Sequence, residues 1–130
     1  MKVFSLFLLL TLSVSIFSCK KVEGEGGAST ISGSLLGKKY NSVNVLIAEY
    51  PLAKHDVFII YGSNSTYFDD KIETSYDGTF EFRNLQPGVY TIFCYEKDDN
   101  EPSGDGVIIQ TVKIEKKKDN VSLGVIEVRD

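Results

Sequence analysis

The chain has 130 residues, which is enough for one domain of ordinary size and too few for two. It carries 14 Lys and Arg residues against 18 Asp and Glu residues, a formal net charge of −4, and its one basic run, Lys116–Lys118, is followed at once by Asp119. This balance argues against nucleic-acid binding, which needs a large basic cluster, and it favours a solvated turn for the lysine run.

The N-terminal residues predict export. Lys2 gives a short positive region, and residues 3–17 form a stretch of 15 residues that is almost wholly apolar. Such a stretch fits a secretory signal peptide and falls short of the ~20 residues that span a bilayer as a helix. The sequence Ile16-Phe17-Ser18-Cys19 follows and resembles the lipobox read by bacterial lipoprotein signal peptidase. The alternative is an ordinary secretory peptide cut nearby, for instance after Ala28, although Ala28 lies well beyond the apolar stretch.

The lipobox resemblance implies a signal peptide over residues 1–18 and a lipid-modified Cys19 at the start of the mature chain. Two or three acyl chains, at ~0.8 kcal/mol per buried CH₂, would hold the protein firmly in a membrane. Residues 19–29 are rich in Gly, Glu and Lys and predict a flexible tether, so the domain is expected over residues 30–130. Because Lys20 and Lys21 replace the Asp that retains lipoproteins in the inner membrane, the expected location is the outer membrane of the cell envelope, with surface exposure as a hypothesis.

The chain has two cysteines. If Cys19 is acylated, Cys94 has no partner for an intramolecular disulfide, and the domain must be held together by its core. Cys94 lies within an apolar segment, where a cysteine behaves as a small hydrophobe rather than as a reactive thiol.

Beyond residue 29 the sequence predicts strands and turns only. Apolar residues alternate with polar ones or form runs of about five, and such runs are too short for helices. The predicted strands, in chain order, with the second as a strand-like excursion, are residues 30–36, 41–50, 57–61, 71–76, 79–83, 88–95, 107–115 and 120–128.

Two tight turns mark the centre of the chain. Asp77-Gly78 is a strong turn signal, and Phe80 and Phe82 follow it with the period of a strand that buries one face. A second turn at Pro87-Gly88 leads to Tyr90. A tyrosine just past such a corner can bury its ring and return its hydroxyl to the corner's backbone, so these three residues predict a structural corner.

The run D-G-x-F-x-F-x-x-L-x-P-G-x-Y, from Asp77 to Tyr90, resembles the signature of the carboxypeptidase regulatory-like, or prealbumin-like, β-sandwich modules. Similar modules are common in surface lipoproteins of Bacteroidota. The resemblance covers residues 31–95 well and the last strands by length and pattern. It implies a single immunoglobulin- or prealbumin-like antiparallel β-sandwich of about seven strands. It is nearly silent on function, since family members serve as accessory, adhesive or carbohydrate-system modules.

The sequence pattern also predicts how the domain closes and which residues form its core. Residues 107–115 and 120–128 are expected to pair as a hairpin around Lys116–Asp119. The predicted core consists of Ile31, Leu35, Val57, Ile59, Phe80, Phe82, Leu85, Tyr90, Ile92, Cys94, Ile108, Val112, Val121, Leu123 and Val125.

One acidic loop is a candidate cation site. Oxygen ligands suit a hard cation such as Ca²⁺, and the candidate ligands are Asp98, Asp99, Asn100, Glu101 and Asp105. The spacing does not match an EF-hand loop, because no Gly occupies the sixth position. The alternative, which we prefer, is a solvated loop without a metal.

The residues for known activities of similar folds are missing. The chain has one histidine, His55, and two arginines, Arg83 and Arg129. A transthyretin-like hydrolase or an intradiol dioxygenase needs several His, Arg or Tyr groups in one place. Carboxylate pairs for glycoside hydrolysis are not excluded by composition, but a small sandwich offers little room for a deep cleft. No enzymatic activity is expected.

Three functional hypotheses follow. The first is a non-enzymatic, lipid-anchored module that binds an envelope protein or a glycan through the loops 62–70 and 96–106, with Tyr67 and Phe68 as contact residues. The alternative for Phe68 is that it tucks under its loop and caps the core. The second hypothesis is a structural module stabilised by a cation in the acidic loop 98–105. The third is a small envelope hydrolase, for which the sequence supplies no second base.

Overall fold

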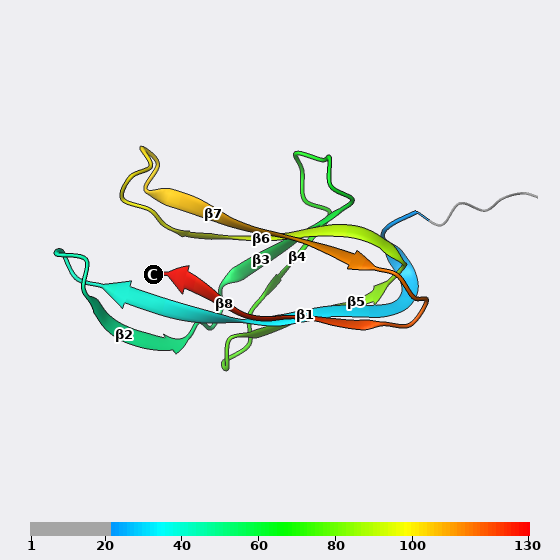
Figure 1. Cartoon of the computed structure of the whole chain (residues 1–130), viewed down its shortest axis with the longest axis horizontal. Coiled ribbons are helices and arrows are strands. Elements are labelled where there is room, and N and C mark those ends of the chain that lie inside the picture. Colours follow the sequence, from blue (N-terminus) through cyan, green and yellow to red (C-terminus); the bar gives the residue numbers. More distant parts are fainter. Residues whose placement is uncertain (1–21) are drawn as a thin grey trace, which may run out of the picture.

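The computed structural model describes residues 22–130, so the predicted signal peptide and Cys19 lie outside the described residues. Those residues form eight strands, and none of them is helical; accordingly they include no helix that could cross a membrane. The strands are β1 (Glu25–Tyr40), β2 (Leu46–Pro51), β3 (Asp56–Tyr61), β4 (Asp70–Glu73), β5 (Thr79–Leu85), β6 (Gly88–Lys97), β7 (Asp105–Ile114) and β8 (Asn120–Arg129). They form two stacked sheets (Figure 1), which confirms the predicted all-β sandwich with eight strands in place of about seven.

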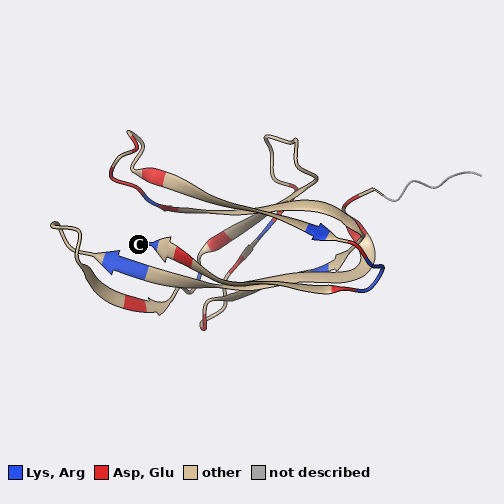
Figure 2. Cartoon of the chain, viewed as in Figure 1, with Lys and Arg blue, Asp and Glu red and all other residues tan. Residues whose placement is uncertain are grey.

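The first sheet, sheet A, is built around β1. This strand pairs antiparallel with β5 along its first half and with β2 along its last residues, while β8 runs parallel to it along its other side. The second sheet, sheet B, is wholly antiparallel in the order β4-β3-β6-β7. The middle of β1, β6 and β7 carries no charge (Figure 2).

The predicted C-terminal hairpin is wrong. β7 pairs with β6 in sheet B, whereas β8 crosses to sheet A and pairs with β1. Hydrogen bonds hold the connecting segment onto β1: Ser29 Oγ donates to Lys116 O at 3.2 Å, and Asp119 N donates to Ser29 Oγ at 3.0 Å. By crossing over, β8 covers an edge of β1 that a hairpin would have left open, and both strands still turn an apolar face to the core.

Most predicted core residues are buried, with one error at the end of the chain. Val125 is 64% exposed, and Ile126 and Val128 are buried in its place. The cause is a β-bulge, because the β1–β8 register shifts after Ser122 and Gly124 adopts a φ of +70°. One extra residue moves every later side chain to the opposite face. The predicted core residues Ile108, Val121 and Leu123 are partly buried against the core, and the prediction missed Leu52 and Ile114.

The predicted tether is too long. Residues 25–29 belong to β1, and Ser29 is fully buried. Even before the strand begins, the Glu23 carboxylate accepts a 3.4 Å hydrogen bond from Val89 N, and Gly24 O accepts one of 2.8 Å from Gln86 N. The Gly-rich composition was interpreted as a flexible tether, but its small residues allow this part of β1 to pack closely against the end of β5. The fold therefore begins near residue 23.

Tyr90 lies near the start of β6, at the corner between β5 and β6, and is fully buried. Its hydroxyl donates a 2.6 Å hydrogen bond to Gln86 O, just before Pro87-Gly88, and accepts one of 2.9 Å from Gly24 N. Burial raises the pKa of the phenol above its ordinary value, so the neutral form that makes both bonds is favoured. The hydroxyl therefore joins the β5–β6 corner to the segment that leads into β1.

Cys94 lies in β6 and is 2% exposed. Burial, with a smaller contribution from the charge of Glu96, raises the pKa of its thiol to about 11. Thiolate is the nucleophilic form, so almost none is present at neutral pH in the folded protein. The side chain acts as part of the core.

We predict that Tyr90→Phe lowers the free energy of unfolding by about 1–3 kcal/mol, because the ring stays buried while Gln86 O and Gly24 N lose their partner. Urea denaturation followed by circular dichroism measures the change. Tyr67→Phe is the matched control, since Tyr67 is 80% exposed and should leave the midpoint unchanged. Equal midpoints for the wild-type chain and Tyr90→Phe would contradict a stabilising role of the hydroxyl.

Candidate functional site

The outer face of sheet B carries four aromatic side chains, which we call the aromatic surface: Phe58, Phe68, Phe93 and Tyr95. The strand register places Lys71 of β4, Phe58 of β3, Phe93 of β6 and Ile109 of β7 side by side in one row across the sheet. Side chains of one row in a sheet point to the same face. The surface is thus set by rigid strands, with Phe68 added from the loop between β3 and β4.

The rings of the aromatic surface pack on one another. Phe58 stacks on Phe93 with ring centroids 4.8 Å apart and an interplanar angle of 9°. Tyr95 meets both rings edge-on at 5.7 and 6.0 Å, and Phe68 meets Phe58 at 4.9 Å. Such pairs contribute about 0.5–1.5 kcal/mol each beyond burial, so Phe68 anchors its loop to the sheet. Phe58 is thereby 9% exposed, whereas Phe68 and Tyr95 remain 50% and 46% exposed.

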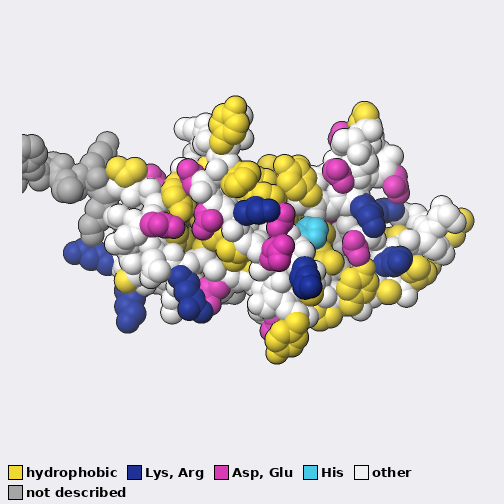
Figure 3. Space-filling view, turned by 180° about the vertical axis from the view of Figure 1, so that it is seen from behind, with side chains coloured by type: hydrophobic (Ala, Val, Ile, Leu, Met, Phe, Trp, Pro, Cys, Tyr) yellow, Lys and Arg dark blue, Asp and Glu magenta, His cyan; other side chains and the backbone are white. Residues whose placement is uncertain are grey.

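The two margins of the aromatic surface differ. Towards β7 it continues into Val107 and Ile109, which are both exposed. Towards β4 it ends at an ion pair in which Lys71 Nζ lies 2.9 Å from Asp56 Oδ2. Figure 3 shows this margin, where hydrophobic side chains lie beside a lysine, several carboxylates and the histidine. The surface is therefore apolar and aromatic in the middle and charged along one side.

The sequence analysis named Phe68 as a contact residue of its loop and missed the other three rings. The predicted alternative, in which Phe68 caps the core, is wrong: its ring packs on the outer face of sheet B. The signal that could have revealed the rest lies in β3 and β6, whose consecutive apolar residues at 57–61 and 92–95 indicate strands with two apolar faces. Tyr67 lies at the loop tip, is 80% exposed, and makes no ring contact with an aromatic side chain of residues 22–130.

The two predicted binding loops do not form one site. The loop 62–69 begins where Tyr61 pairs with Tyr90, and the loop 98–104 begins where Lys97 pairs with Asp105. Tyr90 and Lys97 are seven residues apart along β6, which is roughly 23 Å of extended strand. The expectation that both loops contact one partner holds only for a partner large enough to span sheet B.

The carboxylates of the acidic loop 98–105 do not converge on one point, as the ligands of a metal ion would. Asp98 Oδ1 accepts hydrogen bonds from Asn100 N and Nδ2, and Asp99 Oδ2 lies 3.2 Å from Arg129 Nη2. Glu101 and Asp105 are exposed and stand apart, and within residues 22–130 no three Asp, Glu, His or Cys side chains converge as metal ligands would. Both carboxylates with close contacts are thus engaged within the protein.

The histidine and the two arginines each have a partner of their own. His55 Nε2 lies 2.8 Å from Tyr95 O, which ties the end of β6 to the start of β3. Arg83 pairs with Glu81 at 2.9 Å on sheet A. Arg129 lies over the ring of Tyr40, 4.8 Å from its centroid. None of these contacts resembles a base held next to a nucleophile.

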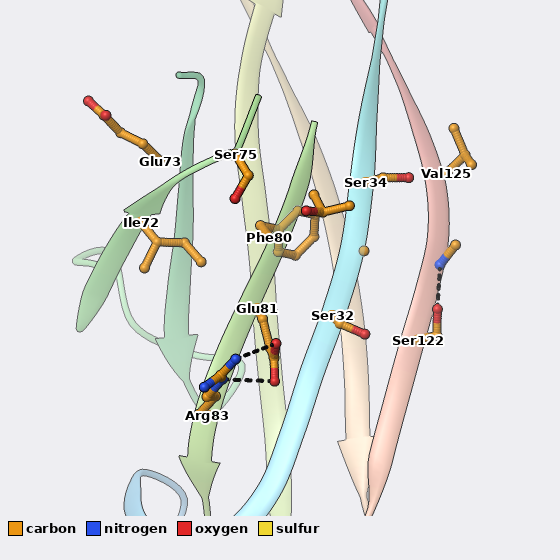
Figure 4. A pocket seen from close by; sticks show the side chains of 13 residues that line it. Ser32, Ser34, Ile72, Glu73, Ser75, Phe80, Glu81, Arg83, Ser122 and Val125 are labelled. Carbon is orange, nitrogen blue, oxygen red and sulfur yellow. Dashed lines mark hydrogen bonds and ion pairs between the residues drawn. The ribbon is translucent and has the colours of Figure 1, made fainter. Parts of the chain in front are cut away.

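The outer face of sheet A holds a shallow depression of about 600 Å³ (Figure 4). Strands β1, β5 and β8 line it, and it extends to Ile72 and Glu73 of β4. Its polar side chains include Ser32, Ser34, Thr79, Glu81 and Ser122. Its lining includes neither His nor Cys, and its one aromatic residue, Phe80, is 4% exposed. Little free energy is gained by removing water from an open surface that is rich in hydroxyl groups. The aromatic surface is therefore the better candidate for binding.

We predict that neither Ca²⁺ nor EDTA changes the melting temperature of the protein, because the Asp98 and Asp99 side chains already have partners within the chain. Differential scanning fluorimetry at millimolar Ca²⁺ and at millimolar EDTA tests this. A rise in melting temperature with Ca²⁺ that Asp98→Asn abolishes would establish the acidic loop as a cation site.

The comparisons with known proteins identify no family. No protein-family description matches the chain, and no curated protein matches it either. Among solved structures, a "putative carbohydrate binding protein" from Pseudomonas aeruginosa is 13% identical, with a TM-score of 0.49 over 82% of this chain and 91% of that one. A 9R-lipoxygenase from Cyanothece is 17% identical, with a TM-score of 0.36 over 78% of this chain and only 16% of the lipoxygenase. Both likenesses are too distant to carry an inference about activity.

Proposed function

We propose that the protein is a non-catalytic binding module of the cell envelope that recognises a protein partner through the aromatic surface. The observation that carries the proposal is the continuity of Phe68, Tyr95, Val107 and Ile109, four exposed apolar side chains held on rigid strands or packed against them. Exposed apolar patches of this kind mark interaction sites, and aromatic residues dominate the binding energy of such sites.

The chemistry of the surface favours a protein over a glycan. Phe58, Phe93 and Ile109 have no hydrogen-bonding side chain, and the Tyr95 hydroxyl is the one such group among the four rings, whereas a sugar ring presents several hydroxyls that need partners. The charged groups nearest the rings, Lys71 and Asp56, lie at one margin and bind each other. An apolar centre with a charged rim is the usual anatomy of a protein–protein interface.

The absence of catalysis is part of the same proposal. Cys94 is buried with a raised pKa, His55 binds a backbone carbonyl, and Arg83 pairs with Glu81. Each of these groups has a structural contact that accounts for it, which leaves no pair poised to act as nucleophile and base.

We further propose that acyl chains on Cys19 hold the module at the outer membrane. The described chain joins the fold at the Tyr90 corner, where Gly24 is hydrogen-bonded. Because the fold begins near residue 23, only four Cα–Cα steps separate it from Cys19, a reach of roughly 14 Å. The module therefore stays against the membrane, and its orientation limits which partners it can meet.

The partner-binding part is tested by photo-crosslinking in cells from position 71, at the margin of the aromatic surface. We expect Phe68→Ala and Tyr95→Ala each to reduce the yield of one crosslinked protein about tenfold or more, because truncated aromatic anchors typically cost 2 kcal/mol or more. Tyr76→Ala is the matched control, since Tyr76 is 90% exposed in the β4–β5 turn and lies outside the surface. Tyr67→Ala shows whether the contact extends to the loop tip.

A yield that is equal in all four variants would contradict a protein site on this face. Melting temperatures of the variants show whether a lower yield reflects a lost contact or a lost fold. If no protein is trapped while the chain is present in the envelope, a glycan screen with the same variants is the next measurement.

The anchor is tested separately. We expect Cys19→Ala to abolish incorporation of an alkyne-tagged fatty acid and to move the protein from the membrane fraction to the soluble fraction. Cys94→Ala is the matched control and should keep the label, because Cys94 is buried in the core. Label that persists in Cys19→Ala would contradict the lipobox assignment.

A further inference from the structure

The outer edge of sheet B is the least protected strand edge of the fold. β7 is the last strand of its sheet and pairs with β6 alone, over ten residues without a register shift. Among residues 22–130, no loop or neighbouring strand donates a backbone hydrogen bond to its open side. Such an edge is a template for another strand, and folded proteins normally blunt it.

The other edges of the two sheets carry the usual protection. β4 has four residues, β2 has six and ends in Pro51, and β8 is interrupted by the bulge at Gly124. β5 has seven residues, and its backbone is interrupted at Asn84, whose φ is +57°. β7 has none of these features: it pairs over ten residues without a register shift, it contains no Pro, and its exposed side chains include Val107 and Ile109. Of the sheet edges in residues 22–130, the open edge of β7 is thus the one best suited to pair with a strand of another chain.

We propose that β7 pairs antiparallel with β7 of a second copy of this chain, about a two-fold axis at Ile109. The sequence of β7 selects this register. A continuous sheet requires that outward-facing residues lie opposite outward-facing residues, so only every second register is allowed. With Ile109 opposite Ile109 of the second copy, Thr111 lies opposite Val107, and Lys113 lies opposite Asp105.

The charges favour this register over its neighbours. Each dimer gains two opposed Asp105–Lys113 pairs, one on each side of the axis. Moving the axis to residue 110 would set Asp105 against Glu115 of the second copy, which is repulsive. Moving it to residue 108 would leave Lys113 without an opposed carboxylate. In the single chain, Lys113 pairs only with the exposed Glu115, at 3.6 Å, and can exchange it.

The pairing would join the two aromatic surfaces. The row that runs from Lys71 through Phe58 and Phe93 to Ile109 would continue into the same row of the second copy, across an eight-stranded sheet. The two-fold axis stands perpendicular to the sheet, so both surfaces face the same side. Two anchors in one membrane demand the same arrangement, an axis normal to the bilayer, and the dimer is thereby compatible with tethering at Cys19.

The register is tested by disulfide trapping in the full-length chain, in membranes treated with a mild oxidant. Residues opposite each other in an antiparallel pair have Cα atoms about 4.5–5.5 Å apart, within the range of a disulfide. We expect Ile109→Cys to form a covalent dimer. Thr111→Cys is the matched control: its equivalent in the second copy lies four residues away, roughly 13 Å along the strand. The wild-type chain sets the background from its own two cysteines.

The charges are tested by sedimentation of the full-length chain in detergent, up to roughly 100 μM, where even weak dimers form. We expect the wild-type chain to dimerise, Asp105→Lys or Lys113→Asp to weaken the dimer about tenfold, and the double swap to restore it. Both side chains are exposed, so the fold should tolerate the changes. A monomer at the highest concentration, equal trapping at positions 109 and 111, or a dimer indifferent to both charge reversals would overturn the proposal.

Discussion

Most of the structure depends on the pairing of one long strand. β1 spans 16 residues and is hydrogen-bonded to three others, so it alone connects every part of sheet A. Its side chains must alternate between a buried face, with Ile31 and Leu35, and an outer face of small polar residues. At Gly33 even a methyl group would lie 2.7 Å from the ring of Phe80, so the strand needs glycine there to let that ring fill the core. The outer face of the same strand carries the serines Ser32 and Ser34, which help to line the depression on sheet A.

Sheet B has the opposite character, because two of its strands are apolar on both faces. The inner side chains of β3 and β6, such as Ile59 and Ile92, fill the core, while Phe58 and Phe93 stack on the outside. Apolar groups on an outer face gain nothing for the core and lower solubility unless something covers them. Phe68 and its loop cover Phe58, but Tyr95 and Ile109 stay exposed. Sheet B therefore exposes aromatic side chains that are held by rigid strands, and this is the physical basis of the proposal that the protein binds its partner there.

The sequence predicts the fold class well, since alternation and turn residues are local signals. Asp77-Gly78 and Pro87-Gly88 define the two central turns, and the spacing to Tyr90 predicts its hydroxyl at the corner, where it donates to Gln86 O. Long-range pairing is not encoded locally. Nothing in the pattern of residues 107–128 distinguishes a hairpin from a crossover, because both bury the same apolar residues. The bulge at Gly124 was not predictable either, since a glycine within a strand indicates either a bulge or the close approach of another backbone segment.

The aromatic surface was hidden for a related reason. The outward-facing apolar residues of β6 have the pattern of a strand that is buried on both faces. The sequence does not show which face is exposed to solvent until the number of layers in the fold is known. With two layers, Phe93 and Tyr95 must be solvent-facing, and the unprotected edge of β7 lies beside them. A partner that binds two such surfaces at once would gain from effective concentration as well as from contact area. The aromatic surface and the open edge of β7 lie on the same sheet. The proposed dimer accounts for both features at once, whereas a monomer would leave the open edge without a role.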